Sequence, residues 1–233
     1  MNGQDAKGAV AFIVLFGALL LMTQGEPVAF HPWQSFALYA LAFAALYRFT
    51  FFAPNKRPRF MRSTAFILVT GIVLRCLFLP YPVSDDVNRY AWEGHIQQLG
   101  INPYTTPPSE LEELSAADPV YSGINHKEVS AIYPPVAMLT FRAISATVYS
   151  LQAYKVFFLG AEVLVLLLLI PLIRQWRQPA HYLALYAWNP LILLYGSGES
   201  HFDVLHLLFI TASLVMYTRG RNRSLDQSVM FLL

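Results

Sequence analysis

Apolar residues in this chain form long blocks, without the alternating or one-faced patterns that mark the strands and surface helices of soluble proteins. Six blocks are almost free of charge and approach the roughly 20 residues that a helix needs to cross a bilayer. They cover residues 8–22, 33–52, 63–81, 153–173, 181–195 and 204–217. This pattern predicts an all-α fold, a polytopic bundle of transmembrane helices that forms one membrane domain over residues 1–233.

Both ends of the chain need separate interpretation. The block at 8–22 follows Lys7 and has the character of a signal-peptide core, but residues 23–27 lack a small-x-small cleavage motif. A second apolar block follows at once, so we expect a retained first span.

A seventh apolar run begins near Gln227 and continues to Leu233. We therefore expect the chain to be the N-terminal part of a longer protein.

Composition agrees with a membrane protein. Hydrophobic residues make up 56% of the chain and charged residues 13%, with a mean hydropathy of +0.44. A typical soluble domain carries about 25% charged residues. The net charge of +2, without a basic cluster interleaved with aromatics, predicts no nucleic-acid partner. A single cysteine, Cys76, excludes an intramolecular disulfide and a cysteine-rich metal site.

Three basic clusters set the expected orientation. They lie at residues 56–62, 174–177 and 219–223, and the positive-inside rule places them in the cytoplasm. The long segment 82–152 and the short loop 196–203 then face the extracytoplasmic side. Within the first, residues 134–149 are apolar but short and contain Arg142. Counting them as a span would move the basic cluster at 174–177 to the extracytoplasmic side, against the positive-inside rule. We therefore expect residues 134–149 to form an interfacial helix.

The outer segment opens with two adjacent carboxylates, Asp85 and Asp86, directly after a predicted span. One interpretation is a helix over 85–99, capped by Ser84 or Asp85, with an ion pair between Asp85 and Arg89. Its apolar stripe would face the bilayer and consists of Trp92, Ile96 and Leu99. A cap needs only one acid, however. The second carboxylate suggests a general base or a divalent-cation ligand.

Other polar groups gather on the same predicted side. Two proline-containing turns present Tyr104 and Tyr133, either as site residues or as interfacial tyrosines. The pair Asn125-His126 could be a polar ligand pair or part of a solvated loop, and we favour the solvated loop. The second outer loop places three ionisable side chains within five positions: Glu199, His201 and Asp203. Asp203 could instead cap the helix that follows it. We predict that His201 lies across one cleft from Asp85 or Asp86.

In their order and spacing, these motifs resemble the integral-membrane glycosyltransferases of the GT-C class. The likeness is greatest to the first mannosyltransferase of glycosylphosphatidylinositol assembly and its bacterial relatives. The matching stretches are the acidic motif at 84–90, the Gly-x-x-Pro-Tyr turn at 100–104, Tyr-Pro-Pro at 133–135, Asn-Pro-Leu at 189–191 and the polar loop at 200–203. The acids here are adjacent, where the eukaryotic family has Asp-x-Asp.

The resemblance implies transfer of a sugar, mannose in the related enzymes, from a polyprenyl-phosphate donor to a lipid-linked or glycan acceptor. The reaction would take place on the extracytoplasmic face of a bacterial inner membrane. Either acid would act as the base, with Asp86 second because Arg89 could hold it. Either acid could also bind a divalent cation, Mg²⁺ or Mn²⁺. The implied substrate-binding residues are Arg75, Arg89, Tyr104, Tyr133, Glu199, His201 and Asp203, of which the cationic ones would meet phosphate.

Two other functions stay open at this stage. A lipid or sugar transporter would place ionisable groups within its spans. The predicted spans carry few such groups, Arg75 and Glu162 among them, which favours chemistry at the surface. The chain could also be a non-catalytic membrane subunit of a glycan-assembly system.

Overall fold

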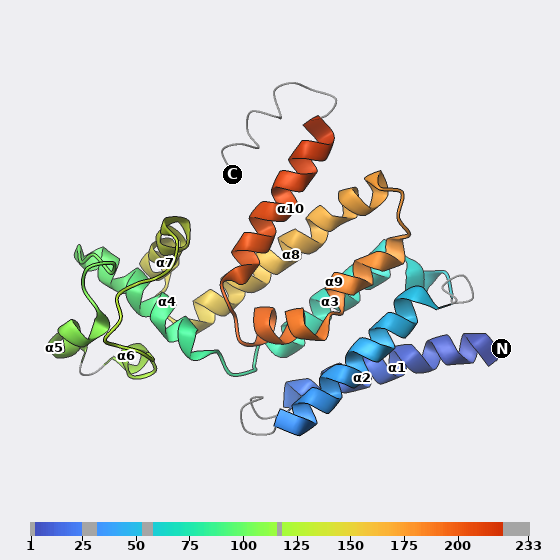
Figure 1. The fold of residues 1–233 in the computed structure, drawn as a ribbon, viewed down its shortest axis with the longest axis horizontal. Coiled ribbons are helices and arrows are strands. Elements are labelled where there is room, and N and C mark those ends of the chain that lie inside the picture. The colour runs from blue at the N-terminus through green and yellow to red at the C-terminus, as the bar shows by residue number, and fades with distance from the viewer. Residues whose placement is uncertain (1–2, 25–31, 53–57, 116–117, 221–233) are drawn as a thin grey trace.

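Helices supply every regular element in the described part of the chain (Figure 1). The computed structural model describes residues 3–24, 32–52, 58–115 and 118–220. The prediction of an all-α fold is therefore confirmed for these residues. The apolar run that begins near Gln227 lies outside them.

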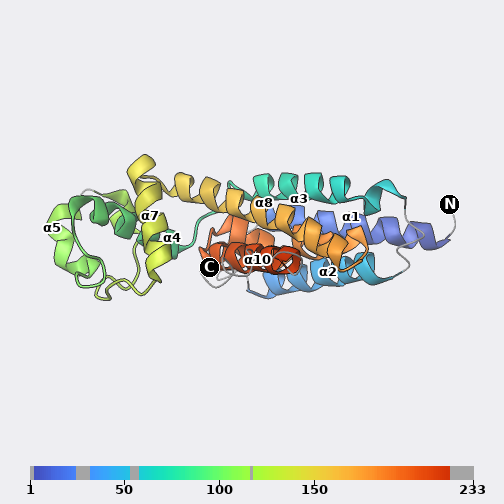
Figure 2. The same cartoon turned by 90° about the horizontal axis from the view of Figure 1, so that it is seen from above.

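The larger part of the molecule is a bundle in which α1 lies along α2, and α10 along α8 (Figures 1 and 2). The bundle helices are α1 (Gly3–Gln24), α2 (Pro32–Phe51), α3 (Thr64–Phe78), α8 (Leu151–Gln175), α9 (Ala184–Ala187) and α10 (Asp203–Gly220). Trp188 occupies the core, with the rings of Phe12, Phe16 and Phe49 centred 4.9–5.6 Å away. Its indole N–H donates to Thr70 Oγ1 over 2.9 Å, so the buried polar atom is satisfied.

Helix length sets a limit on the membrane assignment. Among the described helices, α8 alone is long and apolar enough to cross a membrane as a single piece. A second candidate joins Ile192–Gly198 to Asp203–Arg219, and these two pieces meet at 112°. α1 and α3 are apolar but shorter over their hydrophobic parts. The six-span arrangement accordingly stays a prediction.

One predicted span, 181–195, is wrong as a continuous helix. The chain there forms a 3₁₀ helix (Ala180–Leu183), then α9, and after a break a π-helix (Ile192–Gly198). The break has a local cause. Asn189 Oδ1 accepts from the backbone N–H groups of Leu191 and Ile192, and Pro190, which lacks an N–H, can only begin the following turn.

A second unit contains α4 (Asp85–Ile96) and α7 (Pro135–Thr147), with short α5 (Glu112–Ser115) and α6 (Pro119–Ser122) beside them (Figure 1). The stripe predicted to face the bilayer is corrected here. Trp92 and Ile96 are buried inside this unit, while Leu99 is 51% exposed. The helix expected at 134–149 is present as α7. Its apolar face packs on α4, where Phe141 stacks on Tyr90 at 4.7 Å.

α4 and α7 approach closely at Gly94. A Cβ at this position would lie 2.4 Å from the carbonyl oxygen of Phe141 and 2.7 Å from the Tyr154 hydroxyl. That hydroxyl also donates to the carbonyl oxygens of Tyr90 and Phe141 and shares a hydrogen bond with Ser145 Oγ, so neither neighbour can withdraw freely. The absence of a side chain at Gly94 thus permits the packing on which the second unit depends.

We expect Gly94→Ala to destabilise the protein by about 1–3 kcal/mol, the usual effect of overpacking. Thermal unfolding in detergent would measure it. Gly160→Ala in α8 is the matched control, because a Cβ there meets nothing within 4 Å. The control should be unchanged or slightly more stable. Equal melting temperatures for the two variants would contradict the close-packing argument.

Candidate functional site

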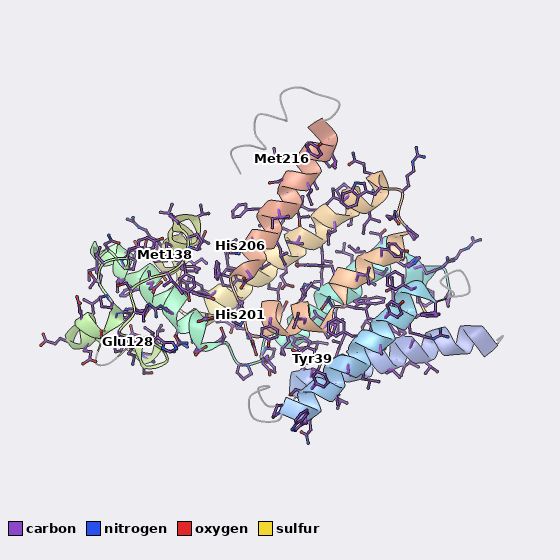
Figure 3. The ribbon with its side chains drawn as sticks, viewed as in Figure 1. Tyr39, Glu128, Met138, His201, His206 and Met216 are labelled. Carbon is purple, nitrogen blue, oxygen red and sulfur yellow. The ribbon has the colours of Figure 1, made fainter. Side chains whose placement is uncertain are left out.

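The two polar loops singled out in the sequence meet where the α4–α7 unit joins the bundle. α3 ends at Phe78, and the chain then turns so that Ser84 precedes α4. The backbone N–H of Ser84 donates to the carbonyl oxygen of Glu199 over 3.0 Å, which joins the loops directly. Figure 3 places His201 at this junction, between α4 and the base of α10.

His201 bridges two carboxylates. Its Nδ1 lies 3.5 Å from Asp86 Oδ2, and its Nε2 lies 3.3 Å from Glu199 Oε2. The imidazole is 24% exposed. Ser200, between the two loop residues, has a φ of 66°, in the left-handed region that non-glycine residues rarely adopt. The structure thus brings His201 next to Asp86, as the sequence predicted.

The two acids determine the charge of this imidazole. Hydrogen bonds to Asp86 first, and to Glu199 second, raise the pKa of His201 to about 9, against the opposing effect of burial. At neutral pH the ring therefore carries a positive charge and can donate from both nitrogens. A cation between two carboxylates holds the loops together.

Asp85 has different partners from those predicted. It is exposed, its Oδ2 accepts from Asn125 Nδ2 over 2.6 Å, and its Oδ1 accepts from the N–H of Asp86 over 3.1 Å. The predicted ion pair with Arg89 is absent, and Ser84 makes no capping hydrogen bond through its side chain. Asn125, expected to be merely solvated, instead orients a candidate catalytic carboxylate.

Arg89 is committed to the inside of the α4–α7 unit. Its Nε lies 2.8 Å from Glu93 Oε1, and its other nitrogens donate to the carbonyl oxygens of His126 and Val129. Burial raises the pKa of Glu93 to about 7, while Arg89 acts in the opposite direction. Arg89 is only 4% exposed. This placement speaks against the predicted phosphate contact, because each nitrogen of the guanidinium already has a protein partner and the residue is buried.

Arg75 is also buried, in the core of the bundle. Its Nε lies 2.6 Å from Glu162 Oε2, and its Nη1 donates to the carbonyl oxygens of Gly71 and Ala187. Ser197 Oγ donates to the same Glu162 oxygen over 3.2 Å. Arg75 is 0% exposed, so its geometry indicates a packing role and gives no support to the predicted phosphate contact.

The two tyrosine turns form one structure. The Tyr104 hydroxyl donates to the carbonyl oxygen of Tyr133 over 2.7 Å, and the N–H of Ala131 donates to that of Pro103 over 2.9 Å. Tyr104 remains 42% exposed, whereas Tyr133 is nearly buried. The Tyr133 ring packs edge-on against Phe202, 5.2 Å away. Sequence reasoning missed this role of Phe202, whose only signal was an aromatic residue inside a polar loop.

Next to the histidine is a largely apolar cavity of about 420 Å³ between α8, the π-helix and α10. Asp203 begins α10, is exposed, and lines this cavity with His201. Its remaining walls are Glu162, Leu191, Ile192, Tyr195, Gly196, Val204 and Leu207. The cavity therefore combines mainly apolar walls with three ionisable side chains, those of Glu162, His201 and Asp203.

The candidate site is acidic overall, and its fit to a metal ion is incomplete. Four carboxylates and one imidazolium gather around the loop junction: Asp85, Asp86, Glu199, Asp203 and His201. Within the described ranges, no group of three or more His, Cys, Asp or Glu side chains is arranged to hold a metal ion. The described residues at this junction therefore do not by themselves supply a complete coordination shell.

The bridge through His201 predicts a pH dependence of stability. The pKa of His201 is raised from 6.5 to about 9 in the folded chain, so its stabilising effect is complete below pH 6.5 and is lost as the pH rises through 9. Melting temperatures measured from pH 5.5 to 10 should fall more steeply for the wild type than for His201→Gln. Parallel profiles would show that the imidazolium does not hold the loops.

Comparison with known protein families gives a match over nearly the whole chain. The family model for alpha-(1->6)-mannopyranosyltransferase, N-terminal domain (the MptA_B family), matches residues 12–232. No curated protein and no solved structure gives a significant match. The family match covers both polar loops and all of the described bundle beyond the start of α1, in agreement with the predicted mannosyltransferase. The chain belongs to the MptA_B family of alpha-(1->6)-mannopyranosyltransferases.

Proposed function

We propose that this chain carries a mannosyl-transfer site at the loop junction. The donor is a polyprenyl-phosphate mannose, and the acceptor is a hydroxyl of a lipid-linked or other glycan on the extracytoplasmic face. The observation that carries the proposal is the meeting of Asp86, Glu199 and His201, from loops over 100 positions apart, at the ends of apolar helices. Membership of a mannosyltransferase family supports the reaction type.

Asp85 is the better placed general base. It is exposed, and its partners are an amide and a backbone N–H, whereas Asp86 is engaged with a cationic ring. In the proposed step Asp85 accepts the proton of the acceptor hydroxyl while that oxygen bonds to the anomeric carbon. The bond between this carbon and the phosphate oxygen breaks, and its electron pair leaves with the phosphate. One displacement of this kind inverts the anomeric configuration.

His201 supplies positive charge near the departing phosphate. Four surrounding carboxylates outnumber it, however, so an anionic donor gains little net attraction from the cluster alone. A divalent cation such as Mg²⁺ or Mn²⁺ would need oxygens from the donor phosphate in addition to Asp85 or Asp86, because Mg²⁺ often binds one or two carboxylates together with substrate phosphates. Such a cation would neutralise charge on the leaving group.

The cavity beside His201 supports a lipid-linked donor. Its walls are mainly apolar side chains of the π-helix and α10, and Asp203, His201 and Glu162 are its ionisable lining residues. An isoprenoid chain matches such walls, and its phosphate would then lie near the loop junction. Tyr104, still partly exposed, is the residue of the tyrosine turns best placed to reach a sugar.

A transporter is the second candidate, favoured by a specific observation. A buried ion pair between Arg75 and Glu162 beside a helix broken at 112° is a feature that transporters share. Both members of the ion pair have protein partners, since Glu162 also accepts a hydrogen bond from Ser197. Transfer of mannose by the purified chain would decide for the enzyme, and lipid-linked sugar movement without transfer would decide for the transporter.

We predict that Asp85→Asn lowers mannosyl transfer about a hundredfold or more, the usual contribution of a general base. Asp86→Asn should weaken transfer less, through loss of the partner of His201. The assay is transfer from synthetic polyprenyl-phosphate mannose in isolated membranes. Glu128→Gln is the matched control, because it removes an exposed carboxylate of the same outer segment. Full activity in an Asp85→Asn, Asp86→Asn double variant would sink the proposed site.

The orientation has its own test. In a Cys76→Ala background, cysteines introduced at Arg59 and Arg174 should react only after the membrane is opened, whereas one at Glu128 should react in intact cells. The basis is the distribution of basic residues between the two ends of the bundle. Labelling of position 174 from outside would reverse the assigned orientation of α8.

A further inference from the structure

A basic pocket lies at the end of the bundle opposite the loop junction. Its volume is about 450 Å³, and three chain segments form it: the C-terminal end of α2, the 3₁₀ helix Phe60–Arg62 before α3, and the 3₁₀ helix Ala180–Leu183 before α9. Figure 1 shows that these helix ends lie together, away from the α4–α7 unit. Arg59, Arg62 and His181 line the pocket.

No carboxylate comes from the segments that build this pocket. The sequence has no Asp or Glu between residues 27 and 84, nor between 163 and 198. The pocket walls fall entirely inside these two stretches. Two guanidinium groups therefore face one hollow without a neighbouring acidic side chain from its own walls, which makes it attractive to an anion.

A buried hydroxyl adds a second, independent indication of a ligand. Thr50 lines the pocket and is 0% exposed, yet its Oγ1 has no hydrogen-bond partner among the residues that the structure describes. A buried donor left unsatisfied costs about 1–3 kcal/mol, so such groups normally have a partner. An anionic oxygen held by the arginines would supply one.

We propose that this pocket binds the phosphate headgroup of an anionic phospholipid from the cytoplasmic leaflet. Arginine suits phosphate because its planar donors can make two parallel hydrogen bonds. Basic pockets between helices on the cytoplasmic side are typical sites for anionic headgroups. The pocket is separate from the proposed transfer site. Its assignment to the cytoplasmic leaflet rests on the membrane orientation given with the proposed function.

Apolar surface beside the pocket favours a lipid over a soluble phosphate. Phe51 lines the pocket and is 45% exposed, and Phe60, next to Arg59, is 59% exposed. The ring of Phe51 lies 5.7 Å from that of Tyr182, which forms another part of the wall. Acyl chains can lie along these rings while the headgroup enters between the arginines.

The test compares two double variants of the full chain in detergent, Arg59→Gln/Arg62→Gln and Arg174→Gln/Arg177→Gln. Both lose two positive charges on the predicted cytoplasmic side, but only the first pair lines the pocket. Native mass spectrometry with phosphatidylglycerol, and with phosphatidylcholine for comparison, reads out binding. We expect the wild type to prefer phosphatidylglycerol, and the pocket variant to bind it about tenfold or more weakly. The control variant should bind as the wild type does.

Several results would overturn the proposal. Equal loss in both variants would mean diffuse surface charge, and equal binding of phosphatidylcholine would mean no headgroup recognition. Glycerol 3-phosphate displacing the lipid at equal concentration would indicate a soluble phosphate ligand. If the arginine variant does not fold, Thr50→Val provides the same comparison. Lipid binding is measured without any mannosyl-transfer assay. Failure of this proposal can therefore be told apart from failure of the proposed enzyme activity.

Discussion

The buried ion pair between Arg75 and Glu162 fixes the frame on which both polar loops depend. Arg75 sits near the end of α3, which leads to Asp85 and Asp86, and Glu162 lies in the middle of α8. The same carboxylate accepts from Ser197 in the π-helix that leads to His201. A Cβ on Gly196 would fall 1.6 Å from Glu162 Oε1, so only glycine permits this approach. Removing one partner of such a buried pair typically costs about 3–5 kcal/mol.

The candidate site forms because the two loops that leave the end of α3 and the π-helix are joined to each other. His201 joins Asp86 to Glu199, a backbone hydrogen bond joins Ser84 to Glu199, and Phe202 packs on Tyr133. Polar bridges and aromatic packing thus act at the same junction. One exposed carboxylate, Asp85, remains outside the bridge with Asn125 as its neutral partner. Asp86 thus holds the loops, whereas Asp85 is the acid that the proposed function uses for proton transfer.

Charge is distributed unequally between the two ends of the molecule. Carboxylates concentrate at the loop junction, while arginines without nearby acidic residues in sequence concentrate at the opposite helix ends. Such polarity agrees with the positive-inside rule and with an anion site on one face only. Under the proposed function, an anionic donor at the acidic face would need positive charge beyond that of His201.

The sequence by itself determined the helical class, the family resemblance and the two loops that carry the candidate chemistry. Long apolar blocks can satisfy their backbone only as helices in an apolar setting, and clustered polar residues next to them must face water. Tertiary structure decided the partners. Spacing suggested that Arg89 holds Asp85 or Asp86 and that Arg75 meets phosphate, but Glu93 and Glu162 take these guanidinium groups. Burying a charge without a partner is too costly, and which carboxylate comes within reach depends on contacts between segments distant in sequence. For the same reason the sequence did not predict the hydrogen bond from Asn125 to Asp85, which forms only in the folded loop.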